Sequence, residues 1–74
     1  MELYDWLATQ RFRTDGVGEL ARYIANDQHC PYWSNRLSTH HIYLIYRNAP
    51  DNLIAALAVA FAEWRRTFAL PAAR

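Results

Sequence analysis

The residues best suited to chemistry in this 74-residue chain are one cysteine and three histidines. Cys30 directly follows His29, and His40 and His41 form an adjacent pair further along the chain. A nucleophilic cysteine needs a base within hydrogen-bond reach and a third group that orients the base. Neighbouring side chains of an extended segment point apart, so His29 cannot act as the base for Cys30, and the histidine pair would reach it only if the fold brought them together. We therefore expect no catalytic cysteine, and we interpret Cys30 as a small buried apolar group.

No spacing typical of a metal site or a phosphate site is found. A single Cys and three His without CxxC, HxxxH or HxxE spacing do not form a structural zinc site. The stretch 15–18 (DGVG) lacks the lysine and the preceding strand of a phosphate-binding loop. The carboxylates that could pair for acid–base catalysis are dispersed: Asp5, Asp15, Glu19, Asp27, Asp51 and Glu63. We expect no catalytic or metal-binding residues, no cofactor and no small-molecule substrate, so we predict that the protein is not an enzyme.

Eight arginines, with no lysine, are the basic groups that could contact phosphate. Seven acidic residues oppose them, and the formal charge of +1 argues against a strong non-specific polyanion binder. Helix starts and hairpin corners nevertheless often bind phosphate. A weak, salt-sensitive nucleic-acid face is therefore one hypothesis, and the alternative is that the arginines are solvated and paired with the acids. The candidate phosphate contacts are Arg11, Arg13, Arg22, Arg36, Arg47, Arg65 and Arg66.

Three Trp, five Tyr and three Phe are more aromatic residues than the predicted helices can clearly bury. Exposed Tyr, Trp and Arg together are typical of protein-interface hot spots. We therefore predict a protein partner or self-association, with candidate interface residues Tyr32, Trp33, Tyr43 and Tyr46. For the pair Tyr32–Trp33 a second interpretation stays open, in which the two rings plug the core from a loop.

Apolar spacing and capping residues predict four helices that would position these groups. They cover about residues 3–10, 16–26, 39–49 and 51–68, with a loop over 27–37. Asp15 is the expected N-cap of the second helix, Ser38 or Thr39 that of the third, and Pro50 suits the first turn of the fourth.

Each predicted helix also has an expected buried face: in the first helix it comprises Leu3, Trp6 and Leu7, and in the second Val17, Leu20, Ala21 and Ile24. In the third helix this face comprises Ile42, Ile45, Tyr46 and Ala49. In the fourth, one stripe comprises Leu53, Leu57, Phe61, Trp64 and Phe68, and the adjoining face comprises Ile54, Ala58 and Ala62. At the corner before the second helix, we expect Arg13 to pair with Asp15 or Glu19, and Gly18 to permit a close approach by another helix or an aromatic ring.

The chain length indicates one domain over residues 1–70, followed by a frayed tail at 71–74. The longest apolar run, 53–62 (LIAALAVAFA), is half the ~20 residues that a transmembrane helix needs, so it is interpreted as a buried helix and no membrane association is expected. With one cysteine there is no internal disulfide, and the N-terminus shows no secretion-signal pattern. We therefore predict a cytoplasmic protein.

The pattern W-L-x-x-Q-R-x-R-x-D-x-x-G-x-L-A, which begins at Trp6, resembles the YozE-like family of short bacterial proteins. Further matching residues are Leu3, Tyr4, Asp5, Ile24, Asp27, Pro31 and the run Ala62-Glu63-Trp64, so that the resemblance covers residues 2 to about 66. Gly16, Cys30 and residues 32–35 depart from the family pattern. The resemblance implies an all-α, SAM-like bundle of four to five short helices, arranged as two helical hairpins packed at right angles. It leaves the activity open.

Overall fold

The computed structural model describes residues 1–68 as a bundle of four helices without a strand in that part of the chain. The helices are α1 (Leu3–Thr9), α2 (Gly16–Ala25), α3 (Leu37–Tyr46) and α4 (Asp51–Thr67). The predicted all-α class is therefore confirmed. The predicted tail at 71–74 and the end of the predicted domain lie outside the described residues.

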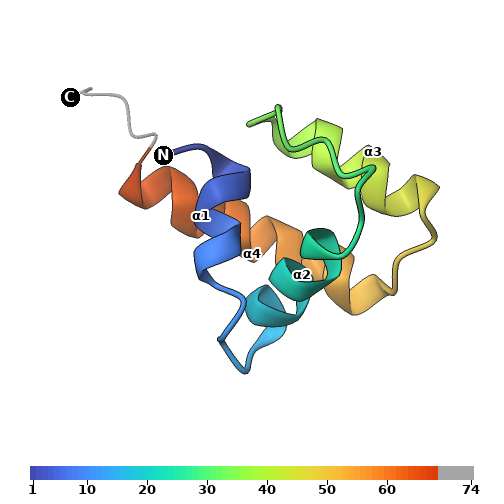
Figure 1. Ribbon diagram of the computed structural model, residues 1–74, viewed down its shortest axis with the longest axis horizontal. Helices are drawn as coiled ribbons and strands as arrows, with labels where there is room; N and C mark the ends of the chain where they lie inside the picture. Colours follow the sequence, from blue (N-terminus) through green and yellow to red (C-terminus); the bar gives the residue numbers. More distant parts are fainter. Residues whose placement is uncertain (69–74) are drawn as a thin grey trace.

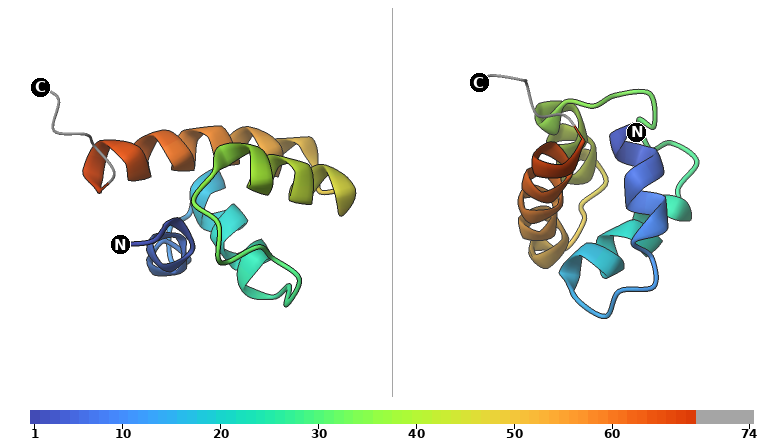
Figure 2. Two further views of the ribbon diagram at one scale, coloured as in Figure 1. Left: turned by 90° about the horizontal axis from the view of Figure 1, so that it is seen from above. Right: turned by 90° about the vertical axis from the view of Figure 1, so that its left-hand side faces the viewer.

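The long helix α4 organises the bundle because it packs against all three other helices. Helix α3 runs antiparallel to α4, to which it is joined by a short turn (Figure 1). Among residues 1–68, α4 is the only helix that α3 contacts. Helix α1 is seen almost end-on where α4 lies across the view, so these two helices cross (Figure 2). The start of the chain meets the last turns of α4, where the indole N–H of Trp64 donates a hydrogen bond to the carbonyl of Met1 at 2.9 Å.

The core is built from one apolar face of each helix, and the faces predicted for the first two helices are buried. Helix α1 contributes Leu3, Trp6 and Leu7, and α2 contributes Val17, Leu20, Ala21 and Ile24. Burial of such side chains is the main stabilising term for a domain of this size.

In α4 the buried face is Leu53, Ala56, Leu57, Ala60 and Trp64. The predicted second buried face was wrong, because Ala58 and Ala62 are exposed and Ile54 is only partly buried. Helices α1 and α2 pack on one side of α4 and α3 runs beside it, so the opposite side has no covering helix (Figure 2). A helix in this position needs only one continuous apolar face.

The two ends of α3 explain where this helix lies in the sequence. It begins earlier than predicted, after the N-cap Arg36, and neither Ser38 nor Thr39 caps it; the Ser34 hydroxyl instead accepts a hydrogen bond from the Arg36 N–H at 3.1 Å. Its C-terminus is a Schellman motif: Asn48 is left-handed with φ of 57°. There the Asn48 N–H donates to the Ile45 carbonyl and the Ala49 N–H to the Leu44 carbonyl, each at 3.0 Å.

Candidate functional site

The side of α3 that faces away from the bundle is apolar. Ile42, Ile45 and Tyr46 leave 67%, 55% and 85% of their area exposed. Together with the exposed Ser38 and His41 they form what we call the α3 outer face. The predicted buried face was therefore wrong for Ile42, Ile45 and Tyr46, because the side chains of the helix that pack inward are His40, Tyr43 and Leu44. Ala49, which follows the helix, is buried as predicted.

Tyr43 was a candidate interface residue, and the structure contradicts this. Its ring is buried, and its hydroxyl donates a hydrogen bond of 2.6 Å to Asp27 Oδ2. Burial and this carboxylate both raise the pKa of Tyr43. The Tyr43 side chain therefore anchors α3 to the end of α2 and is not available to a partner.

Asp27 also binds Arg47, whose Nε lies 3.0 Å from the same carboxylate oxygen. The hydrogen bond from Tyr43 lowers the pKa of Asp27, and the backbone N–H of His29 and the positive charge of Arg47 act in the same direction. Arg47 is therefore half of an ion pair within the chain, which weakens its assignment as a phosphate contact.

The second polar anchor of α3 is His40, which is almost fully buried. Its Nε2 lies 2.9 Å from the carbonyl oxygen of Ser34, and with the proton on Nε2 the ring donates to that carbonyl. Burial lowers the pKa of His40 and favours the neutral imidazole. This contact fixes the loop that carries Tyr32 and Trp33.

The loop pair is exposed and does not plug the core. Trp33 leaves 71% of its area exposed, and Tyr32 is also exposed while its ring packs edge-on against Tyr4 with centroids 6.1 Å apart. The loop residue that enters the core is Cys30, as predicted, and burial raises the pKa of its thiol to about 12. The thiol therefore stays protonated near neutral pH and is a poor nucleophile.

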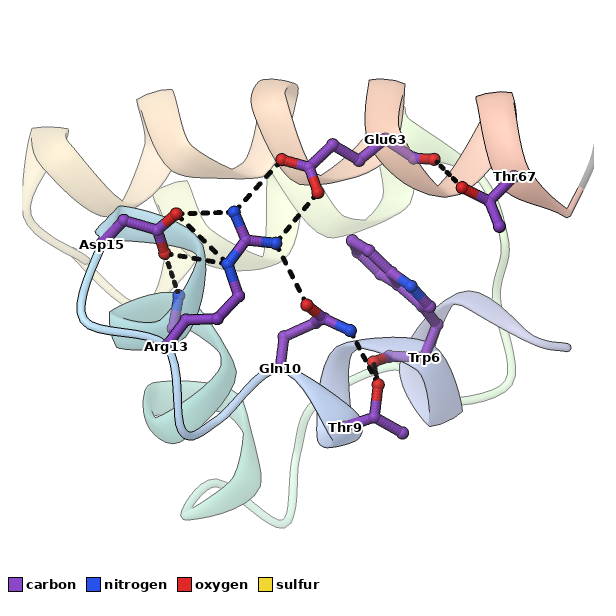
Figure 3. Close-up of polar contacts among 8 residues, drawn as sticks. Trp6, Thr9, Gln10, Arg13, Asp15, Glu63 and Thr67 are labelled. Atoms are coloured by element: carbon purple, nitrogen blue, oxygen red, sulfur yellow. Dashed lines mark hydrogen bonds and ion pairs between the residues drawn. The ribbon is translucent and has the colours of Figure 1, made fainter.

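At the corner between α1 and α2, Arg13 binds three side chains at once (Figure 3). Its guanidinium donates to Asp15, as predicted, with Nε 3.1 Å from Oδ1, and to Gln10 Oε1 at 3.0 Å. It also donates to both carboxylate oxygens of Glu63 on α4, at 2.9 and 3.2 Å. The hydrogen bonds that Arg13 donates, chiefly those to Glu63 and then those to Asp15, raise the pKa of Arg13, and they lower the pKa of both carboxylates.

Asp15 also caps α2, as predicted, because its Oδ1 accepts a hydrogen bond from the Gly18 N–H at 3.1 Å. Glu63 was missed as a partner of Arg13. The two residues are 50 positions apart, and no local spacing indicates that they meet.

Arg22 reaches the same corner from α2. Its Nη1 donates to the carbonyl oxygens of Arg11 at 2.7 Å and Arg13 at 3.0 Å. Arg13, Arg22 and Arg47 are thus bound within the chain, and the structure does not present them together as a phosphate-binding face. Among residues 1–68, the exposed arginines without an ion pair are Arg11, Arg22, Arg36, Arg65 and Arg66. Of these, Arg22 is held across the corner by two carbonyls, whereas Arg11 donates only to the Ala8 carbonyl three residues before it, which leaves Arg11, Arg36, Arg65 and Arg66 as candidates.

The described part of the chain offers no concave site for a small ligand. Residues 1–68 form no pocket and hold no cluster of three or more His, Cys, Asp or Glu side chains that could bind a metal ion. No helix within these residues combines the length and the apolar character needed to cross a membrane.

Comparison with known proteins gives no relative: no family model, no curated protein and no solved structure matches the chain. The arguments for function therefore rest on the exposed surfaces described above.

Proposed function

We propose that this protein is a small, non-enzymatic interaction module that binds another protein through the α3 outer face. One observation carries the proposal: α3 is apolar on both sides, but residues 1–68 cover only the side that bears His40, Tyr43 and Leu44. A helix that is hydrophobic all round is normally buried on all sides. A partner would bury the side that remains.

Comparison with α2 makes the outer face of α3 stand out. The exposed positions of α2 include Glu19 and Arg22, and its C-cap Asn26 is also exposed, which is the usual polar outer surface of an amphipathic helix. On α3 the corresponding side carries two isoleucines and a tyrosine. Contiguous exposed apolar patches of this kind mark interaction sites more often than scattered single residues do.

Trp33 and Tyr32 are further exposed aromatic residues that a partner could contact. Both lie in the loop that leads into α3, and Trp and Tyr are enriched among the residues that dominate binding energy. Tyr46 at the other end of the helix has the largest exposed fraction of the three apolar residues on this face.

We also propose that the fold is SAM-like, that the chain belongs with the YozE-like family of bacteria, and that it acts in the cytoplasm. The antiparallel pair α3–α4 and the pair α1–α2 that crosses it support the first point (Figure 2). The sequence resemblance of residues 2 to about 66 supports the second. The third rests on the sequence alone.

Nucleic-acid binding is the alternative function, and it now depends on four arginines: Arg11, Arg36, Arg65 and Arg66. Arg11 and Arg65 pack over their neighbouring phenylalanine rings, with the guanidinium carbon 4.9 and 5.9 Å from the centroids of Phe12 and Phe61. With three of the seven candidates bound internally, protein association is the better supported function.

A matched pair of variants tests the proposed function. The double variant Ile45→Ser, Tyr46→Ser removes apolar area from the α3 outer face, and Val59→Ser removes an exposed apolar side chain from α4. We expect immobilised wild type and the Val59 variant to retain the same protein from a bacterial lysate, and the double variant to lose it. Capture that is unchanged in the double variant would contradict the proposal.

The alternative has its own measurement. Labelled duplex DNA and single-stranded RNA are titrated with the protein at low and at physiological salt, and binding is followed by fluorescence anisotropy. Saturable binding that weakens steeply with salt and is lost in Arg65→Gln, Arg66→Gln would favour nucleic-acid binding over protein association.

A further inference from the structure

We propose that the occupant of the α3 outer face is a second copy of this chain, in a two-fold dimer whose two α3 helices pack antiparallel. The inference rests on the proposed function, and it names the partner. Three properties of α3 and its ends support it: the helix carries no Asp, Glu, Lys or Arg, opposite charges lie beyond its two ends, and its exposed apolar area is large enough for a weak dimer.

The helix itself contains no acidic residue, lysine or arginine over Leu37–Tyr46. In a two-fold dimer the same surface patch meets itself, so any charge at its centre would face a like charge or be buried unpaired. The α3 outer face avoids this, because its only ionisable groups are His41 and the phenol of Tyr46. An uncharged apolar face is complementary to itself.

Antiparallel packing also pairs the residues of this face favourably. If the two-fold axis passes midway between Ile42 and Ile45, each of these residues faces the other one in the second copy. The same axis places Tyr46 opposite His41 of the copy, because positions 41 and 46 are centred on the same point of the helix as positions 42 and 45. A phenol hydroxyl and an imidazole can then form a hydrogen bond at each edge of the interface.

The charges beyond the two ends of α3 favour the antiparallel arrangement over the parallel one. Arg36 is exposed at the N-terminal end and makes no ion pair among residues 1–68. Asp51 is exposed at the first turn of α4, which lies next to the C-terminal end of α3 (Figure 1). Arg47, at the same end, is already neutralised by Asp27. Antiparallel helices bring Arg36 of one copy close to Asp51 of the other, twice per dimer, whereas parallel helices would place Arg36 beside Arg36.

The available area suits a weak dimer. The three apolar side chains expose on the order of 400 Å² on each copy, and the flanking polar residues bring the total buried in a dimer to about 1,000–1,200 Å². This is the lower end of the range for specific interfaces, where weak and transient complexes are found, so we expect a weak, concentration-dependent dimer.

Sedimentation velocity over a protein concentration series from about 10 µM to 1 mM tests the proposal, since a weak dimer forms only as the concentration approaches its dissociation constant. We expect a concentration-dependent shift from monomer to dimer. Ile45→Asp should abolish the shift while the helical circular dichroism is kept, because the side chain is exposed in the monomer. The control Val59→Asp on α4 should dimerise like the wild type.

A charge exchange tests the antiparallel geometry. Arg36→Glu and Asp51→Arg should each weaken the dimer by about fivefold, and the double variant should recover most of the affinity, because the ion pair is rebuilt in reverse. Additive weakening in the double variant would overturn the antiparallel arrangement.

A wild type that stays monomeric at 1 mM, or a dimer that Ile45→Asp leaves intact, would overturn the dimer itself. If the wild type is monomeric and lysate capture still depends on the α3 outer face, the proposed function stands with a different protein as partner. If the wild type is monomeric and neither it nor any variant captures a protein from the lysate, the proposed function fails as well.

Discussion

Among individual residues, His40 helps to fix the orientation of α3, and its titration can be measured directly. Its ring is buried against the bundle, and Nε2 contacts the Ser34 carbonyl. Together with the hydrogen bond from Tyr43 to Asp27, this contact determines which side of α3 faces the core. A buried polar group without such a partner would cost about 1–3 kcal/mol, so a rotation of the helix that breaks both contacts is strongly disfavoured.

The buried, neutral His40 predicts a loss of stability on acidification. Its folded pKa lies below the ordinary value of 6.5 because burial penalises the charged ring. Below pH 6.5 the unfolded chain therefore binds a proton that the folded chain does not, and the free energy of unfolding falls with decreasing pH, by at most about 1.4 kcal/mol per pH unit, until the folded pKa is reached.

Urea unfolding between pH 7.5 and 5 measures this effect. In His40→Gln the amide can still donate to the Ser34 carbonyl but does not titrate, so we expect a flatter pH profile. Asp15, Asp27 and Glu63 have lowered pKa values, so their contribution is lost only at lower pH, as the solution approaches and passes below their ordinary values of 3.8 to 4.5. An unchanged profile in the variant would show that His40 does not cause the pH dependence.

At the scale of the elements, the sequence predicts α1 and α2 well and α3 poorly, for a physical reason. In the first two helices apolar and polar residues alternate with helical spacing, so that only one face can be buried. In α3 both sides are apolar, and spacing alone cannot choose between Ile42, Ile45 and Tyr46 on one side and His40, Tyr43 and Leu44 on the other. Hydrogen bonds to other segments determine which side is buried, and the spacing of apolar residues carries no information about them.

In the candidate site, too, local features could be predicted from the sequence and long-range contacts could not. The exposure of the loop pair Tyr32–Trp33 and of Tyr46 agrees with the sequence-based expectation of an aromatic surface, whereas Tyr43 lies on the opposite side of its helix. For the arginines, the local pair Arg13–Asp15 could be predicted from spacing. The contacts of Arg13 with Glu63 and of Arg47 with Asp27 depend on the packing of distant segments.

Helix α2 provides a prediction that belongs to this scale, because Gly18 allows its first turn to lie directly on the preceding corner. A Cβ at Gly18 would lie 2.1 Å from the Arg13 carbonyl oxygen, which is backbone and cannot move aside cheaply. A close approach does occur at this glycine, but the expected neighbour was wrong: it is the corner backbone and not another helix or an aromatic ring. We expect Gly18→Ala to destabilise the protein by about 2–3 kcal/mol, in spite of the gain of up to ~1 kcal/mol in helix propensity.

Gly16 on the same helix is the matched control. A Cβ there would lie 3.3 Å from the Cβ of Ala56 on α4, a tight contact that a small shift between two helices can relieve. Thermal unfolding of both variants should show a large drop in Tm for Gly18→Ala and a small change for Gly16→Ala. Equal effects of the two substitutions would contradict the argument from the Arg13 carbonyl.

At the scale of the whole molecule, the two side-chain contacts with the largest sequence separation among residues 1–68 lie on the second half of α4. Trp64 receives the start of the chain through the Met1 carbonyl, and Glu63, the preceding residue, holds the corner between α1 and α2 through Arg13. The exposed face of α3 takes part in neither contact. Substitutions that test binding at α3 should therefore leave this part of the bundle intact.

The Arg13–Glu63 pair predicts a measurable coupling between the two halves of the molecule. Both side chains are about two-thirds buried, at 31% and 29% exposure, and the contact is bidentate. In a double-mutant cycle with Arg13→Gln and Glu63→Gln, we expect a coupling free energy of about 1 kcal/mol at pH 7, at the upper end for partly exposed ion pairs. The pKa of Glu63 is lowered by Arg13, so the coupling is present above the ordinary carboxyl pKa of 4.5 and is lost as the pH falls through the folded value.

A cycle with Arg11→Gln in place of Arg13→Gln should show no coupling, because among residues 1–68 the Arg11 guanidinium donates only to the Ala8 carbonyl. Coupling that is absent at pH 7 would mean that the corner and α4 are held together by apolar packing alone.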